Sequence, residues 1–375
     1  MGRRILMVAG EASGDAQGAR LAAALLERDP TLHLYGMGGP LMREAGVDTV
    51  VDASELSMMG ISEVVSGLRR AFRILARLRA DFRNADRPDL VIPIDLPDFN
   101  LRLAKAAYRA GIPVFYYVAP QVWAWRRGRM DKICRWVDRL VVLFPFELDL
   151  WRERGMDAHF VGHPLAEDVV CTRSGRDTRD RYGLETGRAL LVLLPGSRRK
   201  EIEAMLTPML EAAAIVSDRV QVAVAKAPGL GDGLVEERVA ASGVAAEIVS
   251  GDTYNLVASS DVALVTSGTA TVECALLGCP TVVGYRMSGL TWAIARRLVD
   301  VSHIAMPNLV LQRTVMPELV QDEATPARMA AEVARFLDDA SYRRATIESL
   351  AGVREQLVRP GAALRAADLA LGMLS

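Results

Sequence analysis

The feature that most constrains the fold is a regular alternation of short apolar runs with helical patterns along the chain. The runs are rich in Val, Ile and Leu and lack alternating polar positions, which is typical of strands buried on both faces of a parallel sheet. We expect strands at 5–10, 90–95, 113–120, 139–145, 158–164, 189–197, 220–228, 245–251, 261–268 and 279–286. Pro93 either removes its strand from a central position or marks a local irregularity. The pattern predicts an α/β protein.

A polar stretch at 171–187 interrupts this alternation, which then restarts. The interruption predicts two α/β domains, at 1–168 and 186–345, with helices closing the chain at 346–375. Two domains of this kind place ligands in a cleft between them.

Composition excludes several classes of function. A formal net charge of −1 is unlike that of an electrostatic nucleic-acid binder. The four cysteines form no C-x-x-C pair and the four histidines are scattered, which argues against zinc sites and disulfides and favours a reducing, cytoplasmic compartment. The first apolar run is short and breaks at Gly10, so we interpret it as a strand and not as a signal peptide. No apolar stretch reaches the ~18 residues that a membrane span needs.

Unusual residues follow several strands, where ligands gather in open parallel sheets. The first group contains Gly10, Gly14 and Gly18, with Ser13 and Asp15 as candidate helix N-caps. It is either a glycine loop that brings backbone N–H groups to a ligand or a tight turn before a capped helix.

Two aspartates follow the strand at 90–95. Asp95 is a candidate general base, and Asp98 is a neighbouring charge that would raise the pKa of Asp95. The alternative is that Asp98 caps a helix that starts at Phe99 and that Asp95 closes a turn. The segment 119–130 adds two tryptophans and three arginines, which would either hold an anionic sugar or pack on the domain surface.

The second half offers two amide-lined turns. In 193–203, Gly196 permits close approach, Ser197 can cap a helix and Arg198 can bind phosphate. In 266–280, small polar residues precede a helix that carries Glu273 one turn in, where a carboxylate can accept hydrogen bonds from vicinal ribose hydroxyls. Together these turns predict a phosphate site, although each is also an ordinary helix start.

The segment 59–83 is amphipathic and basic. Apolar residues recur at helical spacing, and six arginines share the segment with few acids. Such a segment is either an interfacial membrane contact or a core-facing helix with a solvated face.

The motifs GEASGD, MGISEVV, IDLPDFN, YYVAPQVWAWRRGR, LFPFE, FVGHP, LLPGSR, SGTATVECALLGCPTVVGYRMS and MPNLVLQRTVMPEL lie in order from residue 8 to about 320. This series resembles the lipid-A-disaccharide synthases. The resemblance implies a GT-B glycosyltransferase with two Rossmann-like domains and a last helix that returns to the first domain. It implies an inverting transfer from UDP-2,3-diacylglucosamine to 2,3-diacylglucosamine 1-phosphate (lipid X), giving a β-1,6-linked disaccharide phosphate and UDP in the synthesis of lipid A.

The resemblance also implies roles for single residues. UDP-sugar binding would involve Gly196, Ser197, Arg198, Ser267, Gly268, Thr269, Glu273, Asn308 and Gln312. Asp95 would take the proton of the acceptor hydroxyl, and the acceptor would contact Ser13, Gly14, Asp15, Arg126 and Arg127. Membrane contact at the inner-membrane surface would involve Ile61, Val64, Val65, Leu68, Arg69 and Phe72.

No cofactor and no metal is expected, since the chain has no Asp-x-Asp motif. A homodimer remains open. Two rival interpretations are a UDP-N-acetylglucosamine 2-epimerase, which shares the GT-B architecture and needs no lipid face, and a binding module for sugar nucleotides or membranes, which would not use Asp95.

Overall fold

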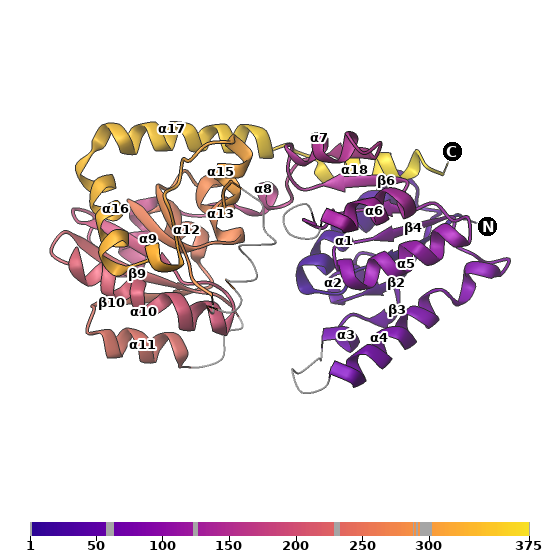
Figure 1. Ribbon diagram of the computed structural model, residues 1–375, viewed down its shortest axis with the longest axis horizontal. Helices are drawn as coiled ribbons and strands as arrows, with labels where there is room; N and C mark the ends of the chain where they lie inside the picture. Colours follow the sequence, from indigo (N-terminus) through magenta and orange to yellow (C-terminus); the bar gives the residue numbers. More distant parts are fainter. Residues whose placement is uncertain are drawn as a thin grey trace. The chain divides into compact units, whose positions relative to one another are not determined.

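The computed structural model describes residues 2–57, 64–122, 127–228, 233–287 and 302–374, together with positions 289 and 292. The chain forms two compact units (Figure 1). The first contains the chain up to Pro164 together with the segment from Arg359 onward, and the second is Leu165–Val358. Each unit is an α/β layer structure built on parallel strands.

The first unit contains a four-stranded sheet in the order β3-β2-β1-β4 and a three-stranded sheet in the order β5-β6-β7. Its strands are β1 (Arg4–Val8), β2 (His33–Gly38), β3 (Asp48–Asp52), β4 (Leu90–Pro93), β5 (Phe115–Tyr116), β6 (Arg139–Val142) and β7 (Asp157–Phe160). Isolated bridges, Val91 with Val114 and Ile94 with Tyr117, connect β4 to β5. Pro93 has no N–H to donate, so this part of the ladder stays irregular, as the sequence predicted.

The helices of the first unit are α1 (Ala12–Arg28), α2 (Pro40–Glu44), α3 (Ser54–Ser57), α4 (Val64–Leu78), η1 (Ala80–Arg83), α5 (Pro97–Arg109), η2 (Arg127–Arg129), α6 (Met130–Trp136), α7 (Glu147–Arg152) and α18 (Ala362–Leu371). The C-terminal α18 lies among the elements of the first unit (Figure 1). It packs against α1, where Arg28 pairs with Asp368 at 2.8 Å. Its buried alanines, with Leu21 and Leu25 of α1, belong to the core of this unit.

The second unit has a single sheet in the order β10-β9-β8-β11-β12-β13, in which every pair is parallel. Its strands are β8 (Ala189–Leu194), β9 (Val220–Lys226), β10 (Ala246–Ser250), β11 (Val262–Thr266), β12 (Thr281–Tyr285) and β13 (Glu318–Val320). This order reverses between β8 and β11, as in a Rossmann sheet.

The helices of the second unit are α8 (Leu165–Asp168), α9 (Gly175–Arg181), α10 (Arg199–Ile215), α11 (Leu234–Ser242), α12 (Thr253–Ala258), α13 (Thr269–Leu276), α15 (Met306–Leu311), η3 (Gln321–Glu323), α16 (Pro326–Asp338) and α17 (Ala340–Leu357). Buried side chains of α10 and α16 pack with those of the sheet in one core. Within the described residues, no helix combines the length and the hydropathy that crossing a bilayer requires.

All ten strands predicted from apolar runs are present, but β2, β3 and β13 are additional. Glycines interrupt the apolar pattern of β2, aspartates flank the two valines of β3, and β13 has only three residues, so none of the three shows a long apolar run. The unit boundaries also differ from the expected ones. The polar stretch contains α9 of the second unit, and α17 belongs to the second unit, so the return to the first unit begins at Arg359 and not at 346.

Candidate active site

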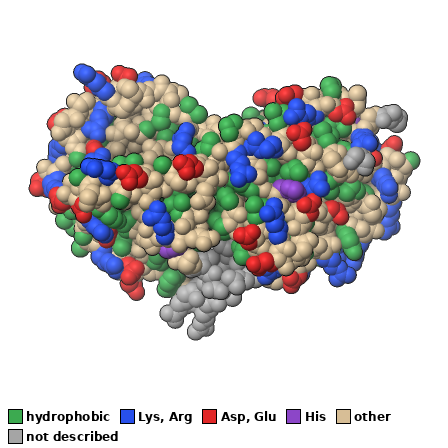
Figure 2. All heavy atoms as spheres, turned by 90° about the horizontal axis from the view of Figure 1, so that it is seen from above, with side chains coloured by type: hydrophobic (Ala, Val, Ile, Leu, Met, Phe, Trp, Pro, Cys, Tyr) green, Lys and Arg blue, Asp and Glu red, His purple; other side chains and the backbone are tan. Residues whose placement is uncertain are grey.

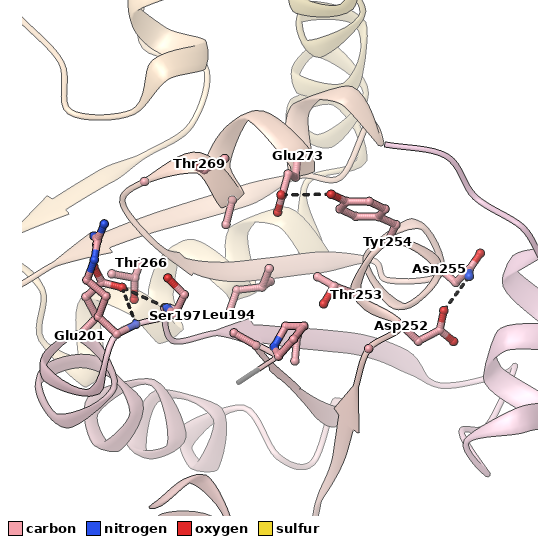
Figure 3. Close-up of a pocket in the computed structure, with 18 of the residues that line it drawn as sticks. Leu194, Ser197, Glu201, Asp252, Thr253, Tyr254, Asn255, Thr266, Thr269 and Glu273 are labelled. Carbon is pink, nitrogen blue, oxygen red and sulfur yellow. Dashed lines mark hydrogen bonds and ion pairs between the residues drawn. The ribbon is translucent and has the colours of Figure 1, made fainter. Parts of the chain in front are cut away.

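A cavity of about 640 Å³ opens in the second unit where the strand order reverses (Figure 3). It is lined by the segments that follow β8, β9, β10 and β11. The sequence-predicted donor residues that line it are Gly196, Ser197, Arg198, Ser267, Gly268, Thr269 and Glu273. The turns that contain Gly196 and Gly268 lie some 75 positions apart in the chain. They meet in this cavity because the carboxyl ends of parallel strands share one edge of the sheet.

The start of α13 presents backbone N–H groups to this cavity. The helix begins at Thr269, after the N-cap residue Gly268. The first N–H groups of a helix have no partner inside the helix, and the helix dipole favours a negative charge at this end. Ser267 is held in place because its hydroxyl donates to the Ile304 carbonyl at 2.9 Å and its N–H donates to Gly284. The start of α13 can therefore receive an anion such as a phosphate.

The turn before α10 is already occupied by a carboxylate of the chain itself. Glu201 Oε2 accepts hydrogen bonds from the N–H groups of Ser197 at 3.0 Å and Arg198 at 3.2 Å (Figure 3). The Arg198 guanidinium pairs with Glu201 Oε1 at 2.9 Å, while its side chain remains 80% exposed. Arg198, and not Ser197, is the N-cap residue, because Glu201 replaces the cap that the Ser197 hydroxyl was expected to provide.

Glu273 and Tyr254 face each other in the cavity. The Tyr254 hydroxyl donates to Glu273 Oε1 at 3.3 Å (Figure 3). Burial raises the pKa of Glu273, and the Tyr254 hydrogen bond opposes this change. Burial, followed by the charge of Glu273, raises the pKa of Tyr254 to about 12, so the phenol remains a donor at neutral pH.

The segment that follows β10, which includes the first turn of α12, was not predicted as part of the site. Asp252, Thr253, Tyr254 and Asn255 line the cavity, yet no glycine-rich pattern drew attention to them. The available signal was their place directly after a predicted strand. Thr266, at the end of β11, belongs to the predicted turn at 266–280; its hydroxyl is buried in the cavity wall with no hydrogen-bond partner among the described residues.

Asn308 and Gln312 are not among the described residues that line this cavity. Asn308 is fully buried: its amide nitrogen donates to Met316 O and Glu318 Oε1, and its oxygen accepts from the N–H groups of Val315 and Met316. Every hydrogen-bonding position of this amide is engaged, so Asn308 supports the loop and offers no free group. Gln312 is exposed and ends α15 in a left-handed conformation.

In the first unit, Asp95 lies where β4 turns into α5. Asp95 and Leu96 both have φ of 50°, a left-handed conformation that costs energy for non-glycine residues. The backbone oxygen of Asp95 accepts hydrogen bonds from the Tyr116 hydroxyl at 2.6 Å and the Asn100 amide at 2.8 Å. These partners hold the backbone of the strained turn from which the Asp95 carboxylate projects.

Burial raises the pKa of Asp95, and the negative charge of Glu11 adds to this effect. The expectation that Asp98 supplies this charge is wrong: Asp98 is exposed, lies in the first turn of α5 and pairs with Arg129. It is also not the cap of a helix starting at Phe99, since α5 begins at Pro97. A half-buried carboxylate with a raised pKa is a plausible general base.

The predicted glycine loop at 10–18 is mostly helix. Residues from Ala12 onward belong to α1, so Ser13 and Asp15 lie inside the helix and do not cap it. Asp15 is buried and accepts hydrogen bonds from the N–H groups of Gly39, Leu41 and Met42 at the start of α2. Its carboxylate therefore ties α2 to α1, while Ser13 is exposed and Gly14 lies close to Ala9 and Ile94.

Parts of the remaining predictions lie outside the described residues. Ile61 and Arg126 are not described, and of Arg127, Val64, Val65 and Leu68 only the backbone is described. All six arginines of the basic segment are exposed. Phe72 is 50% exposed, whereas Leu75 packs into the core. The described residues contain no group of three or more His, Cys, Asp or Glu side chains placed to hold a metal.

Comparisons with known proteins show the family to which the chain belongs. A family model described as lipid-A-disaccharide synthetase matches residues 5–370. The lipid-A-disaccharide synthase of Syntrophus aciditrophicus (strain SB) is 44% identical over 374 residues, covering 99% of this chain and 97% of that protein. That of Myxococcus xanthus (strain DK1622) is 44% identical over 374 residues, with the same coverage of both chains.

Solved structures share the fold at low sequence identity. The glycotransferase of kitacinnamycin is 18% identical with a TM-score of 0.64, and the match covers 100% of both chains. UDP-GlcNAc 2-epimerase from Neisseria meningitidis, bound to UDP-GlcNAc, is 11% identical with a TM-score of 0.58 and 99% coverage of both chains. The fold is thus of the GT-B type, with two Rossmann-like domains. The match along almost the whole length shows that the chain belongs to the lipid-A-disaccharide synthase family of glycosyltransferases in lipid A biosynthesis.

Proposed function

We propose that the protein condenses UDP-2,3-diacylglucosamine with 2,3-diacylglucosamine 1-phosphate, forming the β-1,6-linked disaccharide 1-phosphate and releasing UDP. The observation that carries the proposal is the cavity at the β8/β11 reversal, where the start of α13, the Arg198 guanidinium and the Glu273 carboxylate converge. Amides and a guanidinium suit a diphosphate, and a carboxylate suits ribose hydroxyls.

The proposed reaction is a direct displacement with inversion. Asp95 accepts the proton of the acceptor 6-hydroxyl while that oxygen attacks the anomeric carbon of the donor. The bond from the anomeric carbon to the phosphate oxygen breaks, and its electron pair leaves with UDP. The start of α13 and the Arg198 side chain stabilise the charge that develops on the leaving diphosphate. Ser13, Gly14, Arg126 and Arg127 remain proposed contacts of the acceptor, whereas the Asp15 carboxylate holds the start of α2.

Membrane association is the second part of the proposal. Both substrates carry acyl chains, so a docking face on α4 would bring the enzyme to the inner-membrane surface. Phe72 is half exposed beside Arg102, whose guanidinium lies 5.0 Å from the ring centroid, and Arg69 is exposed in the same helix. Charges of both signs are interspersed over the face of the molecule in Figure 2, so the proposal depends on this local segment and not on a general positive field.

A direct assay tests the reaction. The purified protein is incubated with both acylated sugars in the presence of EDTA, and the products are separated and identified by mass spectrometry. We expect disaccharide 1-phosphate and UDP in equal amounts. Formation of an epimerised sugar nucleotide without disaccharide would favour the epimerase, and binding of UDP without turnover would favour a binding module.

Vesicle co-sedimentation tests the docking face. Phe72→Ser should weaken binding to anionic phospholipid vesicles by about tenfold, because burial of a Phe side chain contributes about 1.5–3 kcal/mol. Ile215→Ser is a matched control, since Ile215 is 58% exposed on α10 of the other unit. Equal effects of the two substitutions would contradict a docking face on α4.

A further inference from the structure

Tyr254 and Glu273 come from different elements and meet only in the folded unit. Tyr254 lies in α12 and Glu273 lies in α13, and both side chains line the cavity. The Tyr254 hydroxyl reaches Glu273 Oε1 at 3.3 Å, as Figure 3 shows. A glutamate has three side-chain torsions, so such a contact from a neighbouring helix restricts where its carboxylate points.

The contact engages only one of the two carboxylate oxygens. Within the described part of the chain, Glu273 has no ion pair, and no other side chain donates a hydrogen bond to it. An ionised carboxylate accepts about four hydrogen bonds in total. The remaining acceptor positions are therefore open to a ligand, and a half-buried carboxylate left without such partners is costly.

We propose that Tyr254 is a positioning residue: it orients Glu273 so that the open acceptors of the Glu273 carboxylate receive the vicinal hydroxyls of a ribose. This pair is then the element that distinguishes ribonucleotides from 2′-deoxyribonucleotides. The inference rests on the proposed function, because it takes the cavity to hold a uridine nucleotide. A site built to receive a hydroxyl rejects the analogue that lacks it, since its buried acceptor then stays unpaired. That rejection requires a fixed carboxylate, which is the contribution assigned to Tyr254.

Isothermal titration calorimetry with UDP and 2′-deoxy-UDP tests the inference. The wild-type protein should bind UDP about tenfold more tightly than 2′-deoxy-UDP, the value of one hydrogen bond to a charged group. Tyr254→Phe should reduce this preference to about threefold or less, because the freed carboxylate turns toward solvent. Tyr342→Phe is the matched control: this tyrosine lies in α17 of the same unit, outside the cavity, and its substitution should leave the preference unchanged.

Further variants separate the outcomes. Glu273→Gln should also reduce the preference, and adding Tyr254→Phe to it should have little further effect, because both act through one carboxylate. A Tyr254→Phe protein that weakens both nucleotides equally, or that keeps the wild-type preference, would overturn the role of Tyr254 alone. Wild-type protein that binds no uridine nucleotide would instead overturn the proposed function and this inference with it. Thermal unfolding of each variant confirms that the compared proteins are folded.

Discussion

The Glu201 carboxylate accepts a hydrogen bond from the backbone N–H of Ser197 at 3.0 Å, four residues before it in the chain. The Glu201 carboxylate, a group of the protein itself, thus binds the N–H groups of the turn at which the sequence predicts an anion site. One of the two predicted amide turns is therefore filled by the protein, and the other, at the start of α13, is the open one. This relationship gives the first two predictions.

Glu201→Ala should destabilise the protein by about 1 kcal/mol, because loss of a capping interaction typically costs this much. Urea unfolding followed by circular dichroism measures the change. Glu203→Ala is the control on the same helix: among the described residues, Glu203 makes an exposed pair with Arg199 at 3.3 Å, worth about 0.3–0.5 kcal/mol. Equal losses in the two variants would show that Glu201 does not stabilise the start of α10.

Gly196→Ala should destabilise the protein more than Gly243→Ala. Both glycines have positive φ, 112° and 68°, so both substitutions add backbone strain of about 1 kcal/mol. A Cβ on Gly196 would also lie 2.6 Å from Glu201 Oε2, whereas nothing lies within 4 Å of a Cβ on Gly243. Urea unfolding compares the two, and UDP titration should show weaker binding only for Gly196→Ala. The reverse order of stabilities would contradict the close approach of Glu201.

Asp95→Asn should lower the rate of disaccharide formation by about 10²- to 10⁴-fold, the usual contribution of a general base. Its affinity for UDP should stay unchanged, because the cavity proposed for the nucleotide lies in the other unit. Product formation and UDP titration are measured on the same preparation. A variant that transfers at a near-normal rate would remove Asp95 from the proposed mechanism.

The pH dependence of transfer should respond to Glu11. A general base acts when ionised, so activity falls as the pH falls through the pKa of Asp95, which burial and Glu11 raise. Glu11→Gln removes a negative charge and should move the acid limb of log(kcat/KM) to lower pH. Asp98→Asn is the control, because Asp98 does not contribute to the raised pKa. A shift with Asp98→Asn but not with Glu11→Gln would contradict this electrostatic assignment.

Glu273→Gln should gain stability at neutral pH while it loses affinity for UDP. The pKa of Glu273 is raised in the folded protein, so the folded state binds its proton more tightly than the unfolded state does. This residue's contribution to the free energy of unfolding therefore falls as the pH rises from the unfolded pKa through the folded one. The gain in stability from Glu273→Gln should be present above the pKa that Glu273 has in the folded protein, and it should vanish below the pKa that Glu273 has in the unfolded chain. Thermal unfolding at two pH values checks the sign; equal differences at both would contradict it.

The sequence determined the class of fold and the region of the cavity that we propose for the nucleotide. Apolar runs without polar alternation require strands covered on both faces, and such strands form parallel sheets whose carboxyl ends share an edge. The positions of Gly196 and Glu273 relative to those runs were enough to place both residues at that edge. Local signals of this kind are informative because the position of each strand along the chain follows from its apolar run.

Only the tertiary structure decided which side chains are free. The family resemblance implies ligand contacts for Asp15 and Asn308, but backbone N–H groups of other segments engage both side chains. The neighbours of Asp95 and Glu273 also differ from those expected: Glu11, and not Asp98, adds to the raised pKa of Asp95, and Tyr254 of α12 donates to Glu273. The pKa and the contacts of a carboxylate depend on which donors and charges lie within about 4 Å of it. Those distances depend on how elements that are distant in the sequence pack together. Spacing along the chain does not encode that packing.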